Sequence, residues 1–216
     1  TGERRAVRVL LMVEMHVGQG EAFEIVVSIL AISLALSFVA SGLNIEPSRF
    51  KFLMAAFTIT IGSGFVLHEL AHKYYAVKYG AKAQFKAWPL GLAGGLALAI
   101  IPQLFQFRAP LFIAPGAVYI YAMRHISAKE NGIISLAGPA TNWLLAFVFF
   151  AIAISIPDNI IISQVADLGA RANMGLAMFN LLPIFPLDGS KVMAWDWKVW
   201  LGAFAFSFLG FGVLGF

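Results

Sequence analysis

Long runs of apolar residues, separated by short polar segments, dominate this chain. About 20 helical residues cross a hydrocarbon core of about 30 Å, so a long apolar run predicts a membrane-spanning helix. We therefore predict about six spans: Ile25–Leu43, Phe52 to about Tyr79, Trp88–Phe107, Asn131–Ile156, about Gln164–Leu187 and Val199–Phe216. The pattern indicates an all-α polytopic membrane protein, in one domain that covers residues 1–216.

The composition supports a membrane location. Hydrophobic residues make up 60% of the chain, charged residues make up 12%, and the mean hydropathy is +0.84. These values lie outside the usual range of soluble globular domains. The net charge of +4 is spread along the chain without a lysine-rich run. We therefore expect a lipid bilayer, and no nucleic acid, as a partner.

Basic residues flank the predicted spans unevenly, which indicates how the chain is oriented in the cell membrane. The positive-inside rule places loops rich in lysine and arginine in the cytoplasm. Such residues precede the first span and follow the second: Arg4, Arg5, Arg8, Lys73, Lys78, Lys82 and Lys86. A site near the end of the second span is therefore expected to be reached from the cytoplasmic side.

The second predicted span carries an unusual set of ionisable residues, "HELAH" at positions 68–72. On a helix, His68 and His72 lie on one face about 6 Å apart, so their imidazoles can bind one Zn²⁺. Glu69 can then take a proton from water as the water attacks a carbonyl carbon. A lone glutamate at this depth costs roughly 2.5–3.5 kcal/mol to insert, so we expect it to have a partner. The pattern predicts a hydrolase that uses a metal ion.

The third metal ligand is less evident from the residues. Catalytic zinc usually has three protein ligands and one open position. The chain contains no cysteine, which leaves His16, His125 or a carboxylate. Asp188 stands out because it ends an uncharged stretch that starts at Ala172. Residues that can break the helix and permit a turn surround it, which would let the carboxylate turn inward: Pro183, Pro186 and Gly189.

Three motifs, in this order, resemble those of the site-2 protease family, the intramembrane zinc metalloproteases of peptidase family M50. They are "HELAH" inside a span, "LAGPATN" at positions 136–142 and "NLLPIFPLDG" at positions 180–189. The resemblance extends over roughly residues 51–191, which we take as the expected catalytic core.

The resemblance implies a role for each motif. The implied ligands of one Zn²⁺ per chain are His68, His72 and Asp188. Glu69 would activate water. Asn180 would hold the substrate backbone or the oxyanion, and would therefore be both catalytic and substrate-binding. Asn142 matches the last position of the family's G-P-x-x-N helix start, and a substrate-binding role is implied for it.

An extra apolar stretch between the two halves of the metal site departs from the minimal family pattern. If Trp88–Phe107 crosses the bilayer and nothing returns, Asp188 lies about 30 Å from His72. Either this segment is re-entrant, or Ala109–Met123 comes back. We expect a protected β hairpin over Leu111–Tyr121, centred on Pro115-Gly116, whose unpaired edge could bind the backbone of an unwound substrate.

The sequence therefore predicts an intramembrane zinc metalloprotease that hydrolyses peptide bonds within or next to transmembrane segments of protein substrates, as in regulated intramembrane proteolysis. A metal or proton transporter could use the same side chains, but it would distribute polar residues along several spans. A prenyl-protein peptidase would need a later glutamate as third ligand. A catalytically silent scaffold would have no need of Glu69.

Overall fold

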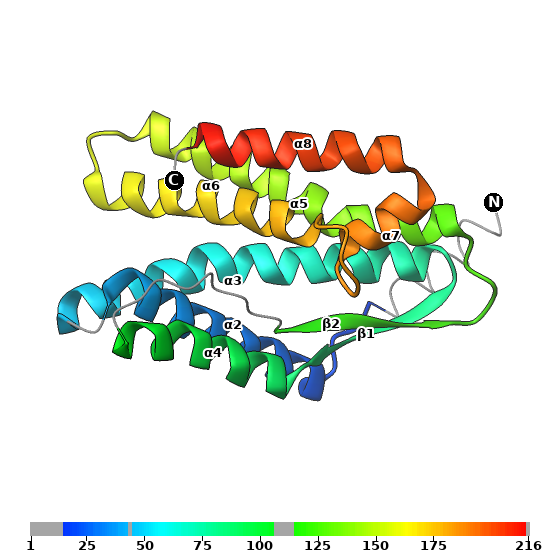
Figure 1. Ribbon diagram of the computed structural model, residues 1–216, viewed down its shortest axis with the longest axis horizontal. Helices are drawn as coiled ribbons and strands as arrows, with labels where there is room; N and C mark the ends of the chain where they lie inside the picture. Colours follow the sequence, from blue (N-terminus) through cyan, green and yellow to red (C-terminus); the bar gives the residue numbers. More distant parts are fainter. Residues whose placement is uncertain (1–14, 43–44, 106–114, 215–216) are drawn as a thin grey trace.

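The computed structural model describes residues 15–42, 45–105 and 115–214 of the chain (Figure 1). These residues form helices and one small sheet, as the sequence predicts. The elements in chain order are α2 (Gln19–Ser41), α3 (Pro47–Lys78), β1 (Ala81–Ala87), α4 (Pro89–Leu104), β2 (Gly116–Ala122), α5 (Ala128–Ser155), α6 (Ile160–Asn180), α7 (Asp188–Trp195) and α8 (Trp197–Val213).

Three of these helices, α2, α3 and α5, are long and apolar enough to cross a membrane, with 23, 32 and 28 residues. They correspond to the first, second and fourth predicted spans. A helix lies within each of the other three predicted spans, but none of these helices is confirmed as a span. α4 and α8 have 16 and 17 residues, and α6 has 21 but carries the Asp167–Arg171 ion pair. A helix of 16 residues is about 24 Å long, which is short of the hydrocarbon thickness.

α3 lies between two groups of helices (Figure 1). α2 and α4 pack together on one side of it, and α5, α6 and α8 lie on the other, with the short helix α7 against α5 and α8. An apolar cluster joins α3 to α2 and to the sheet: Ile25, Ile32, Phe57, Ile61, Phe65 and Phe85. Because α3 is covered on both sides, side chains on it can be removed from lipid as well as from water.

Local sequence signals fix the ends of the long helices. The Glu46 side chain accepts hydrogen bonds from the Ser48 and Arg49 N–H groups at the start of α3, where Pro47 is the first helical residue. Gly80 follows α3 with a φ of 79°, which a residue with a Cβ rarely adopts. Ser127 and Glu130 form a capping box at the start of α5.

β1 and β2 pair in antiparallel register, with Ala81 opposite Ala122 and Ala87 opposite Gly116. β2 therefore returns the chain to the end of α3, and the prediction that this region comes back is confirmed for residues 116–122. The predicted hairpin over Leu111–Tyr121 is wrong in its pairing, because the strand begins at Gly116 and its partner is distant in sequence. Residues 111–114 lie outside the described residues.

A buried ion pair joins α2 to α3. Lys73 Nζ lies 2.9 Å from Glu21 Oε2 and 3.0 Å from Glu21 Oε1, and the two side chains are 2% and 4% exposed. Lys73 also donates to the His16 carbonyl oxygen. Lys73 is therefore not a free cytoplasmic charge, which corrects its use in predicting the orientation. Arg4, Arg5 and Arg8 lie outside the part of the chain that the structure describes.

The same face of α2 covers the outer edge of β1. Glu21 Oε1 accepts the Phe85 N–H at 3.0 Å, and Glu24 Oε2 accepts the Ala87 N–H at 2.7 Å. Unpaired strand edges invite pairing with other chains, and here two carboxylates satisfy the N–H groups of β1. Among the described residues, the outer edge of β2 has no neighbouring strand, and the Val118 N–H on that edge faces Glu69.

Breaking the buried pair is expected to destabilise the fold. Lys73→Met leaves the Glu21 carboxylate buried without its cation, which costs about 3–5 kcal/mol. Adding Glu21→Gln removes the stranded charge but keeps an oxygen for the Phe85 N–H, so most of the loss should be recovered. The exposed pair between Lys86 and Glu24 supplies the control, since Lys86→Met should cost about 0–1 kcal/mol. Unfolding of the purified protein in detergent measures these differences, and equal losses for the two lysines would contradict the expectation.

Candidate metal centre

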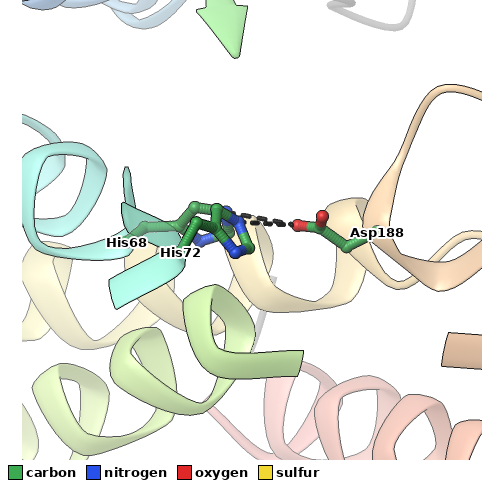
Figure 2. A group of neighbouring side chains, drawn as sticks. All are labelled: His68, His72 and Asp188. Carbon is green, nitrogen blue, oxygen red and sulfur yellow. Dashed lines mark hydrogen bonds and ion pairs between the residues drawn. The ribbon is translucent and has the colours of Figure 1, made fainter. Parts of the chain in front are cut away.

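Three side chains from distant parts of the chain meet beside α3 (Figure 2). His68 Nε2 and His72 Nε2 are 2.9 Å apart. Asp188 Oδ2 lies 3.3 Å from the first and 3.1 Å from the second. All three side chains are buried. His68 is ten residues before the end of α3 at Lys78, so the group lies about 15 Å along the helix from that end.

The other ring nitrogen of each histidine is already committed to a hydrogen bond. His72 Nδ1 lies 2.7 Å from the carbonyl oxygen of Ile134, which can only accept. His68 Nδ1 lies 2.6 Å from Asn142 Oδ1. Both Nδ1 atoms therefore carry the proton, and the lone pair of each neutral ring is on Nε2, where it faces Asp188.

The end of α6 and the start of α7 bring the carboxylate into place. α6 ends at Asn180, a turn segment containing both predicted prolines follows, and Asp188 begins α7. Gly189 does not form the predicted turn, since it is helical. It is needed for another reason, because a Cβ there would overlap the carbonyl oxygens of Leu181 and Leu182. The Leu181 oxygen also accepts the indole N–H of Trp200 at 2.8 Å, which ties this turn to α8.

The two oxygens of the Asp188 carboxylate face different partners, and Oδ2 faces both imidazoles. Its second oxygen, Oδ1, lies 3.6 Å from Lys191 Nζ, one turn further along α7. One oxygen thus faces a cation of the protein, and the other faces the two histidines.

The donor set fits a zinc ion. Zinc binds imidazole nitrogen and carboxylate oxygen at about 2.0–2.2 Å, and the edge of such a tetrahedron is about 3.3 Å. The three donor atoms are 2.9–3.3 Å apart. Three electron pairs at this spacing repel one another unless a cation lies among them. Two imidazoles with one carboxylate, and no thiolate, are a typical catalytic zinc set.

Glu69 lies next to the ligands, as predicted. It is 8% exposed, and its Oε2 is buried without a hydrogen-bond partner in the part of the chain that the structure describes. The N–H of Val118 on β2 faces the same carboxylate. A buried carboxylate oxygen that is free to take a proton, beside a metal-binding group, suits a general base.

Gly138 of α5 packs directly against both histidines. A Cβ at this position would lie 2.5 Å from His68 Nε2 and 2.6 Å from His72 Nε2. The glycine of the "LAGPATN" motif is therefore required by the close approach of α5 to the metal-binding atoms. Sequence reasoning did not identify this role.

The two predicted asparagines lie in different settings. Asn142 is fully buried, and its side chain supports His68. Asn180 is half-buried at the end of α6 and donates to the Leu176 carbonyl within its own helix. The substrate-binding and oxyanion roles that the sequence suggested for these residues stay predictions. His16 and His125, the other candidate histidine ligands, are exposed and lie outside the ligand group.

Two supporting residues were missed in the sequence. Ile134 acts through its backbone oxygen, for which no side-chain signal exists. Asn173 of α6 contacts Asn142, and it could have been noticed as a polar residue inside an apolar helix. Ile134 accepts from His72 directly, and Asn173 reaches His68 through Asn142. Both residues are on other helices than the histidines, so no spacing in the sequence connects them to the "HELAH" motif.

A methyl group at position 138 should disable the metal centre. Gly138→Ala must displace one or both imidazoles, and disturbing the support of a metal-binding histidine costs at least about 10-fold in metal affinity. Zinc affinity, measured by competition with a chelator, should fall by at least that factor. Gly94→Ala on α4 is the matched control, since a Cβ there meets nothing within 4 Å. Unchanged zinc affinity in a folded Gly138→Ala protein would contradict the described packing.

The comparisons with known proteins agree with this geometry. The model of "Peptidase family M50" matches residues 56–167. A protein of Methanocaldococcus jannaschii named as a zinc metalloprotease, MJ0611, is 40% identical over 84% of this chain and 87% of its own length. YwhC of Bacillus subtilis, also named as a zinc metalloprotease, is 31% identical over 65% of this chain and 68% of its own length. No solved structure matches the chain significantly.

A second Methanocaldococcus jannaschii protein, the zinc metalloprotease MJ0392, is 27% identical over 59% of this chain and 30% of its own length. The match to the family model includes the "HELAH" and "LAGPATN" motifs, and the alignment to MJ0611 covers most of both chains. With two histidines and an aspartate placed to bind one metal ion, the chain belongs to peptidase family M50.

Proposed function

We propose that this protein is an intramembrane zinc metalloprotease that cleaves peptide bonds within or next to transmembrane segments of its substrates. As a member of peptidase family M50 with a donor set that fits zinc, the chain is a zinc metalloprotease. The finer proposal adds the location of the scissile bond, the membrane-embedded substrate and hydrolysis by activated water.

One observation carries the proposal. Three metal-binding atoms lie together, two from His68 and His72 of α3 and one from Asp188 of α7. Glu69 is beside them on α3, a helix of 32 residues that is apolar enough to cross a membrane. Ionisable groups at such a position are costly and need a function. A scaffold or packing role would not require three converging lone pairs.

Different residues would bind the metal ion, transfer the proton and orient the metal ligands during hydrolysis. Zinc, when bound by His68, His72 and Asp188, would supply a Lewis acid that polarises a peptide carbonyl and acidifies water. Glu69 takes the proton of the attacking water on its carboxylate and returns it to the leaving amide nitrogen. The Nδ1–H bonds to Ile134 and Asn142 keep the two imidazoles oriented through the cycle.

The open edge of β2 is suited to hold the substrate backbone. The N–H of Trp88 donates to the carbonyl oxygen of Pro115, so the backbone groups of Trp88 point toward the β2 side of β1. Because backbone groups alternate along a strand, those of Lys86, which is opposite Ala117, also point toward β2. On β2, the residues paired toward β1 are therefore Ala117, Tyr119 and Tyr121, and the N–H groups of Val118 and Ile120 point to the other edge. Val118 N–H faces Glu69. A peptide added as a strand along this edge would pass the general base.

The location follows from the same features. Apolar helices make this a membrane protein, and we propose a multi-pass arrangement in the cell membrane, with a transmembrane protein as substrate and the bilayer as surroundings. Lys78 ends α3, and Lys82 and Lys86 follow it, which supports a site reached from the cytoplasmic side. This arrangement would let a helix enter from lipid, unwind and present its backbone to β2.

Removing the proposed base should abolish cleavage without removing the metal. Glu69→Gln keeps the shape of the side chain but cannot accept the proton, so cleavage of a model single-pass substrate should fall by about 10²- to 10⁴-fold. Zinc content should remain at that of the unsubstituted protein. His68→Ala, which removes a ligand, should lose both. If Glu69→Gln cleaves at the unsubstituted rate, or moves metal ions across vesicle membranes in a zinc-dependent way, the protease mechanism is wrong.

The role of the β2 edge is tested by removing one outward N–H. Ile120→Pro deletes this group but leaves the ladder to β1, and should lower cleavage by about two- to tenfold, through one lost hydrogen bond to a strand-like substrate. Ile120→Ala keeps the N–H and controls for the side chain. Zinc affinity should be unchanged in both. Equal cleavage by the two variants would mean that substrates do not pair with this edge.

A further inference from the structure

Behind His68 lies a chain of two buried asparagine side chains, Asn142 of α5 and Asn173 of α6. Asn142 Oδ1 is 2.6 Å from His68 Nδ1. Asn142 Nδ2 donates to Asn173 Oδ1 at 3.0 Å and to the Gly64 carbonyl at 3.2 Å. Asn173 Nδ2 donates to the carbonyls of Gly169 and Thr60, at 2.9 and 3.4 Å. Both asparagines are 0% exposed.

Backbone carbonyls fix the direction of this chain. A carbonyl oxygen can only accept, so the Asn173 group that faces Gly169 and Thr60 must be the amide nitrogen. Its oxygen therefore faces Asn142, and the Asn142 group opposite it must also be a nitrogen. That orientation turns the Asn142 oxygen toward His68, which must donate from Nδ1. The lone pair of His68 is thereby left on Nε2, facing His72 and Asp188.

The two histidines differ in which group keeps the proton on Nδ1 and the lone pair on Nε2. The Nδ1 atom of His72 donates directly to a backbone carbonyl, that of Ile134, and no side chain can alter this. The orientation of His68 depends on the Asn142 side-chain amide, whose Nδ2 donates to two acceptors, the Gly64 carbonyl and Asn173 Oδ1. Asn173 is the side chain of the two. His68 is thus the ligand whose metal-binding nitrogen is set by a residue two hydrogen bonds away.

The helix packing is shaped around Asn173. A Cβ at Gly64 of α3 would overlap Asn173 Oδ1, so only glycine lets this oxygen reach the Asn142 amide. The side chain joins three helices: its own α6, α5 through Asn142 and α3 through Thr60. A buried amide needs several hydrogen-bond partners. Asn173 has them, and they allow one orientation of its amide, with the nitrogen toward Gly169 and Thr60 and the oxygen toward Asn142.

We propose that Asn173 is a positioning residue for the metal centre: together with the Gly64 carbonyl it orients the Asn142 amide, which keeps the His68 proton on Nδ1 and leaves Nε2 free to bind zinc. The proposal rests on the metal site described above and does not depend on the reaction. Supporting residues behind a metal-bound histidine typically change metal affinity by about 10- to 100-fold. Asn173 is expected to have an effect of that size without touching the metal.

Two substitutions separate orientation from packing. Asn173→Leu removes the oxygen that accepts from Asn142, and zinc affinity should fall by about 10- to 100-fold. Asn173→Asp is expected to be neutral at this buried position; it keeps an oxygen toward Asn142 but has one donor in place of two for Gly169 and Thr60, so it should keep most of the zinc affinity. If Asn173 only tied the helices together, Asn173→Asp would lose as much as Asn173→Leu. Asn173→Ala replaces the leucine variant if that protein does not fold.

The measurements use the full chain in detergent and need no substrate. Zinc affinity is obtained by competition with a chelator, and thermal unfolding of the metal-free protein reports the fold. Nitrogen NMR of labelled histidines should show His68 protonated on Nδ1 in the unsubstituted protein and a mixture of the two forms in Asn173→Leu.

Ser207→Ala is the control, since it removes a buried hydrogen bond from Trp143 elsewhere and should leave zinc affinity unchanged. Wild-type zinc affinity in a folded leucine or alanine variant would overturn the proposal. So would a His68 proton on Nε2 in the unsubstituted protein. A protein that binds zinc as described but cleaves nothing would refute the proposed function and leave this inference intact.

Discussion

The convergence of two neutral imidazoles and one carboxylate inside an apolar fold is the constraint on which the rest of this structure depends. Each Nε2 is free to bind a metal ion only because each Nδ1 has an acceptor, the Ile134 carbonyl for His72 and Asn142 for His68. These acceptors are on α5, whereas the histidines are on α3 and Asp188 is on α7. The metal centre therefore depends on three helices being held at fixed distances.

Close helix contacts provide those distances. Gly138 lets α5 approach the histidines, Gly64 makes room for Asn173, and Gly189 lets α7 pack on the backbone at the end of α6. Each glycine is placed where a Cβ would overlap a metal ligand, a supporting amide or a carbonyl. In a bilayer, where the hydrophobic effect between helices is absent, such close packing with interhelical hydrogen bonds is a main source of association.

The sheet and α2 form a second unit on the other side of α3. The carboxylates of Glu21 and Glu24 satisfy the outer N–H groups of β1, and the buried Lys73 compensates the charge of Glu21. This leaves β2 with its open edge toward Glu69. The Val118 N–H of β2 faces Glu69, so this edge of the sheet lies beside the carboxylate next to the metal centre.

The sequence by itself determined the helical class, three long apolar helices among the six predicted spans, and His68, His72 and Asp188 as candidate metal ligands, because these depend on local composition and spacing. Only the tertiary structure decided the partner of β2, the burial of Lys73 and the roles of Gly138, Asn142 and Asn173. It also made α4 and α8 shorter than the predicted spans. Hydropathy does not encode how distant segments meet, and a hydrogen bond between two helices leaves no periodic signal in either.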